Sequence, residues 1–177
     1  MDRPMSSASF KLMGLMFKVR DFVKPRSEIL KEAGIKPGDR VLDFGCGPGS
    51  YIHTAAQLAG PAGKIYAMDI HPLATRQARR IADSRKLTNV ETIESDCKTA
   101  MPDRELNVVL LYDTFHDLSR PEDVLRELHR VLKPEGILSF CDHHMKEEDI
   151  LEQVTASELF KLANKGKRTY SFTKTGQ

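Results

Sequence analysis

Apolar residues recur along the chain at two spacings, and together these spacings predict alternating strands and helices. Five short runs rich in branched and apolar residues suit buried strands: 40–45, 64–70, 89–95, 107–113 and 137–142. Between them, apolar residues repeat at the spacing of one helical face over 50–60, 71–87 and 121–132. This alternation predicts an α/β fold in which most strands are parallel.

The two ends of the chain depart from this alternation. An acidic helix is predicted around 147–156, and two short strands around a Lys-Gly turn in 159–174 predict an antiparallel hairpin. We expect a helical extension, 1–35, before the main domain, 36–177. The apolar stripe of this extension packs against the sheet, caps the ligand cleft or contacts another subunit. Its members are Met5, Phe10, Met13, Met16, Phe17 and Phe22.

Composition excludes several classes of protein. Hydrophobic residues make up 40% of the 177 residues, charged residues 29%, and the net charge of +2 is too small to indicate a nucleic-acid binder. Three cysteines without paired spacing do not predict a disulfide framework. The apolar patch Phe10–Phe17 is too short to span a bilayer, so we expect a cytoplasmic protein with no membrane span. The acid-free basic stretch 160–177 is interpreted as solvated surface.

A glycine-rich loop, "DFGCGPG", joins the first predicted strand to the first helix. In parallel sheets, ligands bind at the carboxyl ends of the strands, where glycines let a ligand approach the main chain. Gly45, Gly47 and Gly49 give the spacing G-x-G-x-G, with Ser50 where a dinucleotide fingerprint has its third glycine. The Lys of a phosphate loop is also missing, so both phosphate-binding interpretations lose support.

Two acids follow the next strands and indicate a nucleoside. Asp69 lies at the end of the second strand, where a carboxylate can accept hydrogen bonds from both ribose hydroxyls. Asp96 follows the third strand and could accept from an adenine amino group, with Ile70 and Cys97 flanking the ring. Taken alone, Asp96 is equally well interpreted as a turn or cap residue.

Five segments in order resemble the successive motifs of class I S-adenosylmethionine-dependent methyltransferases. They are "VLDFGCGPG", "IYAMDIHP", "ESDC", "VVLLYDTFHDL" and "LHRVLKPEGILSF", within residues 35–142. They are most similar to the type 11-like group that includes the ubiquinone/menaquinone-biosynthesis enzymes. The resemblance implies a Rossmann-like sheet of seven strands, order 3-2-1-4-5-7-6, with strand 7 antiparallel and helices on both faces. It also implies S-adenosylmethionine as cofactor and S-adenosylhomocysteine as product.

The resemblance further implies cofactor contacts. Asp69 would hold the ribose, and Tyr112 would lie under the methyl-bearing sulfur. Two positions depart from the family pattern without touching its cofactor site: Asn107 replaces an aspartate and Glu135 a glycine. The methionine part would contact the first strand and glycine loop, and the adenine the ends of the second and third strands: Asp43, Gly45, Cys46, Gly47 and Gly49, then Ile70, Asp96 and Cys97.

A sulfonium methyl is already activated, so the protein must chiefly align the acceptor with it for in-line displacement. A general base helps when the acceptor carries a proton, and the candidates after the fourth and fifth strands are Tyr112, His116 and His143. The alternative roles for His116 are to shape the cleft or to contact the substrate. Of the pair His143-His144, we expect one to face the cleft and the other to cap the following helix.

The same strand ends also carry residues of the types that bind metals or metalloids. Asp113, Asp142 and a histidine are of the right type for a divalent metal, but without a spacing signature we expect none. Cysteines near three strand ends, at 46, 97 and 141, leave open a thiol or metalloid acceptor.

We expect a small-molecule acceptor and no nucleic acid, because "YDTF" replaces the "NPPY"-like tetrapeptide of nucleic-acid amino-methyltransferases. The expected oligomeric state is a monomer or homodimer. Two alternatives to a methyltransferase are a cofactor-binding regulatory module without turnover and an NAD(P)-dependent oxidoreductase. The missing third glycine of the dinucleotide fingerprint counts against the second.

Overall fold

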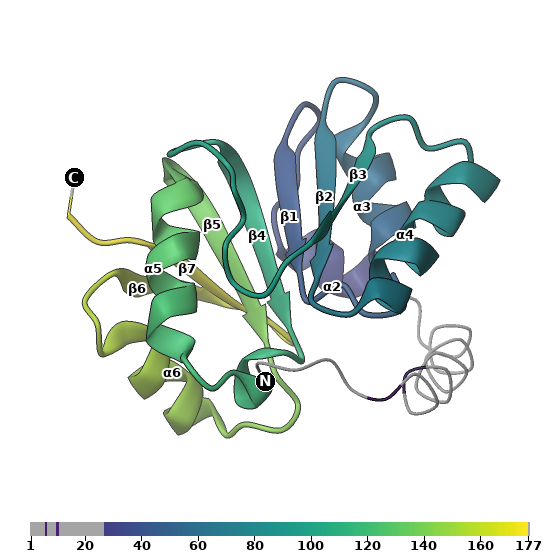
Figure 1. Cartoon of the computed structure of the whole chain (residues 1–177). Helices are drawn as coiled ribbons and strands as arrows, with labels where there is room; N and C mark the ends of the chain where they lie inside the picture. Colours follow the sequence, from purple (N-terminus) through teal and green to yellow (C-terminus); the bar gives the residue numbers. More distant parts are fainter. Residues whose placement is uncertain (1–5, 7–9, 11–26, 177) are drawn as a thin grey trace.

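The computed structural model describes Ser6, Phe10 and residues 27–176, and its strands and helices alternate as the sequence predicts (Figure 1). In chain order the elements are α2 (Ser27–Glu32), β1 (Arg40–Phe44), α3 (Ile52–Ala59), β2 (Lys64–Asp69), α4 (Pro72–Ser84), β3 (Val90–Glu94), β4 (Leu106–Tyr112), the 3-10 turn η1 (Phe115–Asp117), α5 (Pro121–Val131), β5 (Leu132–Cys141), α6 (Glu147–Thr155), β6 (Phe160–Lys165) and β7 (Tyr170–Lys174).

All seven strands form one sheet in the order β3-β2-β1-β4-β5-β7-β6, which confirms the expected fold class. The five strands β1 to β5 pair in parallel. The helices and loops between them return the chain each time to the edge of the sheet where the strands begin. β7 pairs antiparallel with β5, and β6 pairs antiparallel with β7. The C-terminal hairpin therefore closes the sheet, as its Lys-Gly turn predicts.

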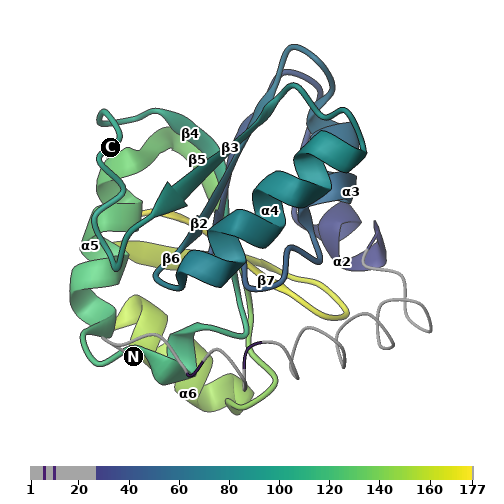
Figure 2. The same ribbon diagram turned by 45° about the vertical axis from the view of Figure 1, so that its right-hand side comes forward.

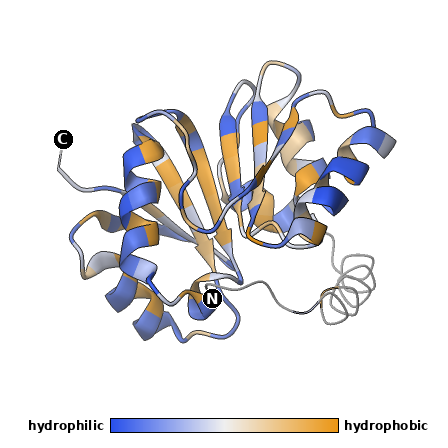
Figure 3. Cartoon of the chain, in the orientation of Figure 1, coloured by the Kyte–Doolittle hydropathy of each residue, from blue (hydrophilic) through white to orange (hydrophobic). Residues whose placement is uncertain are grey.

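Helices cover both faces of the sheet (Figure 2). Alternate residues of β4 show how the faces are divided. Val109 and Leu111 pack in a cluster with apolar residues of α5 and α6, whereas Val108 and Leu110 pack in a cluster with α2 and α3. Because both faces are buried, the central strands read as continuous apolar runs, which Figure 3 shows as orange arrows between mostly blue helix surfaces.

One boundary differs from the prediction. β5 begins at Leu132 rather than 137, so the expected turn at 133–136 is the irregular first part of the strand, with a register shift opposite Leu106 and Val108. The side-chain oxygen of Asn107 accepts hydrogen bonds there from the Arg40 N–H at 3.0 Å and from Lys133 Nζ at 3.1 Å. Asn107, a departure from the family pattern, thus ties three chain segments together at the amino end of the sheet.

The described part of the N-terminal extension packs on the domain. Ile29 and Leu30 of α2 are buried in the cluster that α3 shares with β1 and β4. Phe10 is 6% exposed and packs against α3 and α4. The predicted stripe residues Met5, Met13, Met16, Phe17 and Phe22 lie outside the described residues, so the division at 35/36 stays a prediction. Within the described ranges, no helix is long and apolar enough to cross a lipid bilayer.

Candidate active site

The loops at the carboxyl ends of the parallel strands surround one cavity of about 980 Å³. This is the edge of the sheet where open α/β folds bind ligands, and the size suits a ligand as large as a nucleoside derivative. Three predicted site residues do not line it: Asp43, Gly49 and Cys97. The others do: Gly45, Cys46, Gly47, Asp69, Ile70, Asp96, Tyr112, His116 and His143.

Glycine is needed at two positions of the loop for different structural reasons. Gly47 has a φ of 50°, and a Cβ built there would meet no atom within 4 Å, so its missing side chain leaves open space beside the cavity. Gly49 has a φ of 84°, and its Cβ would lie 2.7 Å from Ile81 Cδ1 and 3.0 Å from Ile52 Cδ1. Gly47 therefore clears room for a ligand, whereas Gly49 lets the loop pack against α3 and α4.

Asp69 holds the glycine loop against the end of β2. Its Oδ2 accepts the Gly47 N–H at 2.9 Å, and its Oδ1 accepts the His71 N–H at 2.7 Å. Burial raises the pKa of the Asp69 carboxyl, and these two hydrogen bonds partly oppose the rise. Each carboxylate oxygen has a second lone pair, so Asp69 can still accept a hydrogen bond from a ligand hydroxyl.

Asp43 lies behind the loop rather than in the cavity wall. Its carboxyl is 2% exposed, and Oδ2 has no hydrogen-bond partner among the described residues. Burial, together with repulsion from Asp69, raises the pKa of Asp43 to about 7. Asp43 therefore has no direct contact with the cavity in this conformation.

Asp96 and Cys97, which follow β3, have different surroundings. Asp96 is exposed in the cavity wall, and its Oδ1 accepts the Cys97 N–H at 2.6 Å, which lowers the pKa of Asp96. The Cys97 side chain packs on the core cluster under α5 instead of facing the cavity. Asp96 thus keeps a charged acceptor at the site, whereas the predicted Cys97 contact has no support from this geometry.

The sequence reasoning missed His71 as a site residue. Its Nδ1 accepts the Leu73 N–H at 3.1 Å and so caps α4, and its buried ring lies 4.6 Å from the ring of Phe10. Both rings line the cavity beside Asp69. The signal available in the sequence was a capping residue directly before a proline at a helix start.

Tyr112 contributes its ring to the wall. Its hydroxyl lies 2.7 Å from Ser139 Oγ, and its ring meets that of Tyr51 edge-on at 5.0 Å. Burial raises the pKa of Tyr112 well above its usual value, so the phenol stays protonated. This arrangement favours a role in shaping the cavity over the role of a base.

His116 is held by a buried carboxylate at the end of β5. Its Nδ1 lies 2.9 Å from Asp142 Oδ2, and the side chain of Asp142 is shielded from solvent. The same carboxylate also accepts the backbone N–H groups of His116, at 3.2 Å, and of His144, at 3.0 Å. With Nδ1–H donated to Asp142, the free nitrogen of His116 is Nε2, which lies 3.7 Å from Asp117 Oδ2.

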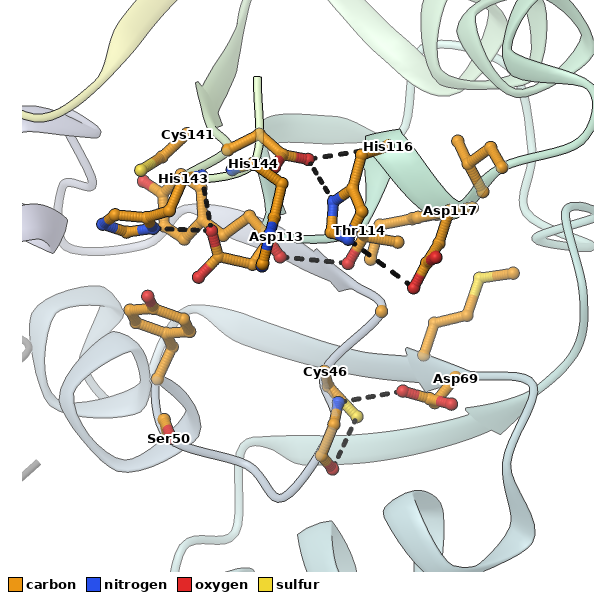
Figure 4. Close-up of a pocket in the computed structure, with 18 of the residues that line it drawn as sticks. Cys46, Ser50, Asp69, Asp113, Thr114, His116, Asp117, Cys141, His143 and His144 are labelled. Carbon is orange, nitrogen blue, oxygen red and sulfur yellow. Dashed lines mark hydrogen bonds and ion pairs between the residues drawn. The ribbon is translucent and has the colours of Figure 1, made fainter. Parts of the chain in front are cut away.

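A second histidine-carboxylate pair lies beside the first. His143 Nδ1 lies 2.6 Å from Asp113 Oδ1, and the buried Cys141 thiol is next to both (Figure 4). Cys141 is the last residue of β5, and Asp142 and His143 follow it directly in the loop before α6. Burial and the neighbouring carboxylates raise the pKa of Cys141 to about 12.

The three cysteines do not converge. Cys46 is buried in the glycine loop, and burial raises the pKa of its thiol. Cys46 and Cys141 line the cavity on opposite walls in Figure 4, and Cys97 does not line it. The sequence left open a site made of all three thiols. Because the thiols do not come together, the structure does not support such a site.

Two basic residues reach the cavity from the β6–β7 turn. Lys167 and Arg168 line it, although the sequence was interpreted as solvated surface there. Glu32 Oε2 fixes this turn by accepting three hydrogen bonds of 3.0 Å, from the Arg168 N–H, the Thr169 N–H and the Thr169 hydroxyl. These hydrogen bonds between Glu32 in α2 and the distant hairpin could not be read from the sequence.

Known proteins resemble the chain in sequence. The family described as "Methyltransferase domain" matches residues 35–176. The ubiquinone/menaquinone biosynthesis C-methyltransferase UbiE of Ectopseudomonas mendocina is 32% identical over 124 residues, 69% of this chain and 48% of that protein. The demethylmenaquinone methyltransferase of Geobacillus stearothermophilus is 27% identical over 132 residues, 74% of this chain and 56% of that protein. The chain thus spans about half the length of these relatives.

A solved structure matches over nearly the whole length of both chains. The crystal structure of a SAM-dependent methyltransferase from Aquifex aeolicus has a TM-score of 0.82 and 26% identity, and the match covers 97% of this chain and 98% of that one. With the family match over residues 35–176, the chain belongs to the S-adenosylmethionine-dependent methyltransferases, and its cofactor is S-adenosylmethionine.

Proposed function

We propose that this chain transfers a methyl group from S-adenosylmethionine to a small-molecule acceptor, with His116 as the proton acceptor. The observation that carries the proposal is the pairing of two walls across one cavity (Figure 4). One wall is the glycine loop tied to Asp69, and the other carries a histidine tied to a buried aspartate. Methyl transfer to an acceptor that carries a proton needs a cofactor site on one side of the acceptor and a proton-accepting group on the other.

The residues present fit the cofactor. Gly47 leaves open space at the cavity edge, Asp69 has free lone pairs for ribose hydroxyls, and Asp96 keeps a charged acceptor for an amino group. A bound sulfonium or ammonium group would favour the charged forms of the Asp43 and Asp69 carboxyls, whose pKa values burial raises. The cofactor supplies an electrophilic methyl group, and the chain has to position its acceptor.

His116 is prepared for proton transfer by its own contacts. Asp142 holds the ring through Nδ1, fixes the tautomer and stabilises the charge that develops when Nε2 takes a proton. The Asp142 carboxylate is itself held by two backbone N–H groups, so the ring cannot turn without breaking several hydrogen bonds. A proton taken from the acceptor as its new bond to carbon forms would thus reside on His116 Nε2.

The acceptor class is inferred from the relatives and from the wall. The relatives' names describe methylation in quinone biosynthesis, so phenols and quinols, which lose a proton on methylation, are the first acceptors to test. Lys167 and Arg168 at the cavity mouth favour acceptors that also carry an acidic group. A cavity of about 980 Å³ lined by residues of several loops suits a small-molecule acceptor.

The test is a screen of small molecules with a methyl-labelled donor, read by product mass. We expect transfer to at least one phenolic acceptor, with loss of transfer in His116→Gln and normal transfer in His53→Gln, whose side chain lies outside the cavity on α3. Tight S-adenosylhomocysteine binding without transfer to any acceptor would instead support the regulatory module. Equal transfer by His116→Gln and the wild type would overturn the assigned base.

A further inference from the structure

The described residues contain one group of three side chains that could together hold a metal ion: Asp113, Cys141 and His143. One ligand atom from each, a carboxylate oxygen, the thiol sulfur and an imidazole nitrogen, lies within 4.8 Å of the other two. Around a tetrahedral zinc, bond lengths of about 2.0–2.3 Å put ligand atoms roughly 3.3–3.8 Å apart. The three atoms therefore need movements of about 1 Å, which side-chain torsions can provide.

Backbone hydrogen bonds hold the three residues in place. The Asp113 N–H donates to the Cys141 carbonyl at 2.8 Å, and the His143 N–H donates to Asp113 Oδ1 at 3.0 Å. The parallel pairing of Tyr112 with Cys141 sets the relative height of the two strand ends. Asp113 has a φ of 49°, an uncommon conformation for a residue other than glycine, and it follows the last residue of β4 directly.

The local charge favours a cation. Three carboxylates, those of Asp113, Asp142 and Glu32, and one guanidinium, that of Arg168, act electrostatically on the Cys141 sulfur. The Asp113 carboxylate is itself one of the three ligands and that of Asp142 belongs to the residue next to Cys141, so negative charge lies close to the sulfur. The site is also accessible, since the His143 side chain is 61% exposed and all three residues line the cavity.

We propose that Asp113, Cys141 and His143 form a binding site for a zinc-type divalent cation, with its fourth position open to the cavity. The donor set of one oxygen, one nitrogen and one sulfur selects borderline metals such as zinc or cobalt over magnesium and calcium, which prefer oxygen alone. Three protein ligands with one open position are the arrangement of metal sites that bind substrate.

Binding balances protons as follows. The sulfur-metal bond forms as the Cys141 thiol releases its proton to solvent. The proton that His143 Nδ1 shares with Asp113 Oδ1 moves through solvent to His143 Nε2, so the imidazole stays neutral and Nδ1 is free to bind the ion. The use of the site in catalysis rests on the proposed function: an acceptor oxygen or sulfur in the open position would lose its proton more readily, beside His116.

The test uses untagged full-length protein, stripped with a chelator and titrated with cobalt(II), which gives a thiolate-to-cobalt charge-transfer band when sulfur is a ligand. We expect one equivalent of tightly bound cobalt, displaced by zinc. Cys141→Ser should abolish the band, and His143→Ala should weaken cobalt binding by more than about tenfold. The matched controls Cys97→Ser and His144→Ala, whose side chains lie outside the trio, should leave the band unchanged.

Three results would overturn the site: no charge-transfer band, a band that survives Cys141→Ser, or a band lost in Cys97→Ser. Because the His143 side chain is exposed, His143→Ala keeps the test decisive if Cys141→Ser does not fold. S-adenosylhomocysteine binding by the stripped protein separates the two proposals. Cofactor binding without a cobalt site contradicts only the metal site, and a cobalt site without cofactor binding contradicts only the proposed function.

Discussion

His116 Nδ1 lies 2.9 Å from Asp142 Oδ2, and the same oxygen accepts the backbone N–H of His116 at 3.2 Å. Ring and backbone are therefore both tied to one shielded carboxylate at the end of β5. The bond between them joins the loop after β4 to the loop after β5. Because Asp142 occupies Nδ1, the basic nitrogen of His116 is Nε2.

The first prediction concerns this pair. His116→Gln keeps a polar side chain but cannot take up a proton, so we expect kcat to fall by about 10²–10⁴-fold for the acceptor found in the screen. KM and S-adenosylhomocysteine affinity should change by only a few-fold, because neither requires proton transfer. Asp142→Asn should lower kcat and shift its pH profile, since the tautomer and the imidazolium lose their partner. A fall in cofactor affinity equal to the fall in kcat would mean that His116 only shapes the cavity.

The second prediction concerns Asp69, which holds the loop and would hold the ribose. Asp69→Ala removes both acceptors, and hydrogen bonds to a charged group contribute about 1.5–3 kcal/mol each. We therefore expect S-adenosylhomocysteine affinity, measured by calorimetry, to fall at least about tenfold. Asp83→Ala, an exposed acid on α4, is the matched control and should bind like the wild type. Equal affinity in Asp69→Ala and the control would contradict the ribose assignment.

The third prediction concerns the pH dependence of stability. The pKa of Asp43 is about 7 in the folded protein and 3.8 as its ordinary value, so the folded state binds more protons between these values. Stability of the ligand-free protein should therefore fall as pH rises from about 4 to about 7, and then level off. Between pH 5 and 8 this one group contributes a loss on the order of 2–3 kcal/mol.

Asp43→Asn removes that contribution and leaves every other titratable side chain in place, although the repulsion that Asp69 feels from Asp43 is lost as well. The pH slope of the unfolding free energy, measured in urea at pH 5 and pH 8, should be smaller in Asp43→Asn than in the wild type. At pH 8 the variant should be the more stable of the two without ligand. Identical slopes in the two proteins would show that Asp43 titrates normally.

The fourth prediction separates two glycines of the same loop. Gly49→Ala places a Cβ 2.7 Å from Ile81 Cδ1 at a φ of 84°, so we expect a loss of about 1–3 kcal/mol in the unfolding free energy. Gly47→Ala meets no protein atom within 4 Å, so its stability loss should be limited to the strain of its φ, about 1 kcal/mol. Cofactor affinity should fall more in Gly47→Ala. Thermal unfolding and calorimetry on both variants check this, and the reverse ranking would contradict the division of roles.

The fold follows from patterns that are local in the sequence. The glycine spacing and the acid at the end of β2 already indicated a nucleoside site, and the run Asn107–Asp113 indicated a central strand. The start of β5 was missed because the sequence "KPEG" is typical of a turn, whereas pairing with β4 keeps it in the sheet despite a register shift. Tertiary pairing there overrides local turn preference.

Site details that depend on contacts between distant segments were not predictable. The Asp142 partner of His116 is 26 residues away, and Glu32 reaches a turn 136 residues away. A strand pattern says which face a residue occupies, but not which loop folds over it. This is why the sequence indicated both His116 and Asp142 but not their pairing, and why Cys97 was placed at the cavity although its side chain packs on the core.

Cofactor binding is the most direct test of the central claim. S-adenosylhomocysteine titrated by calorimetry into the full-length protein should bind with one site per chain, and NAD at the same concentrations should not. Saturating S-adenosylhomocysteine should raise the melting temperature, as any ligand does that binds only the folded state. Failure of S-adenosylhomocysteine to bind, or stabilisation by NAD instead, would contradict the assignment of the cofactor.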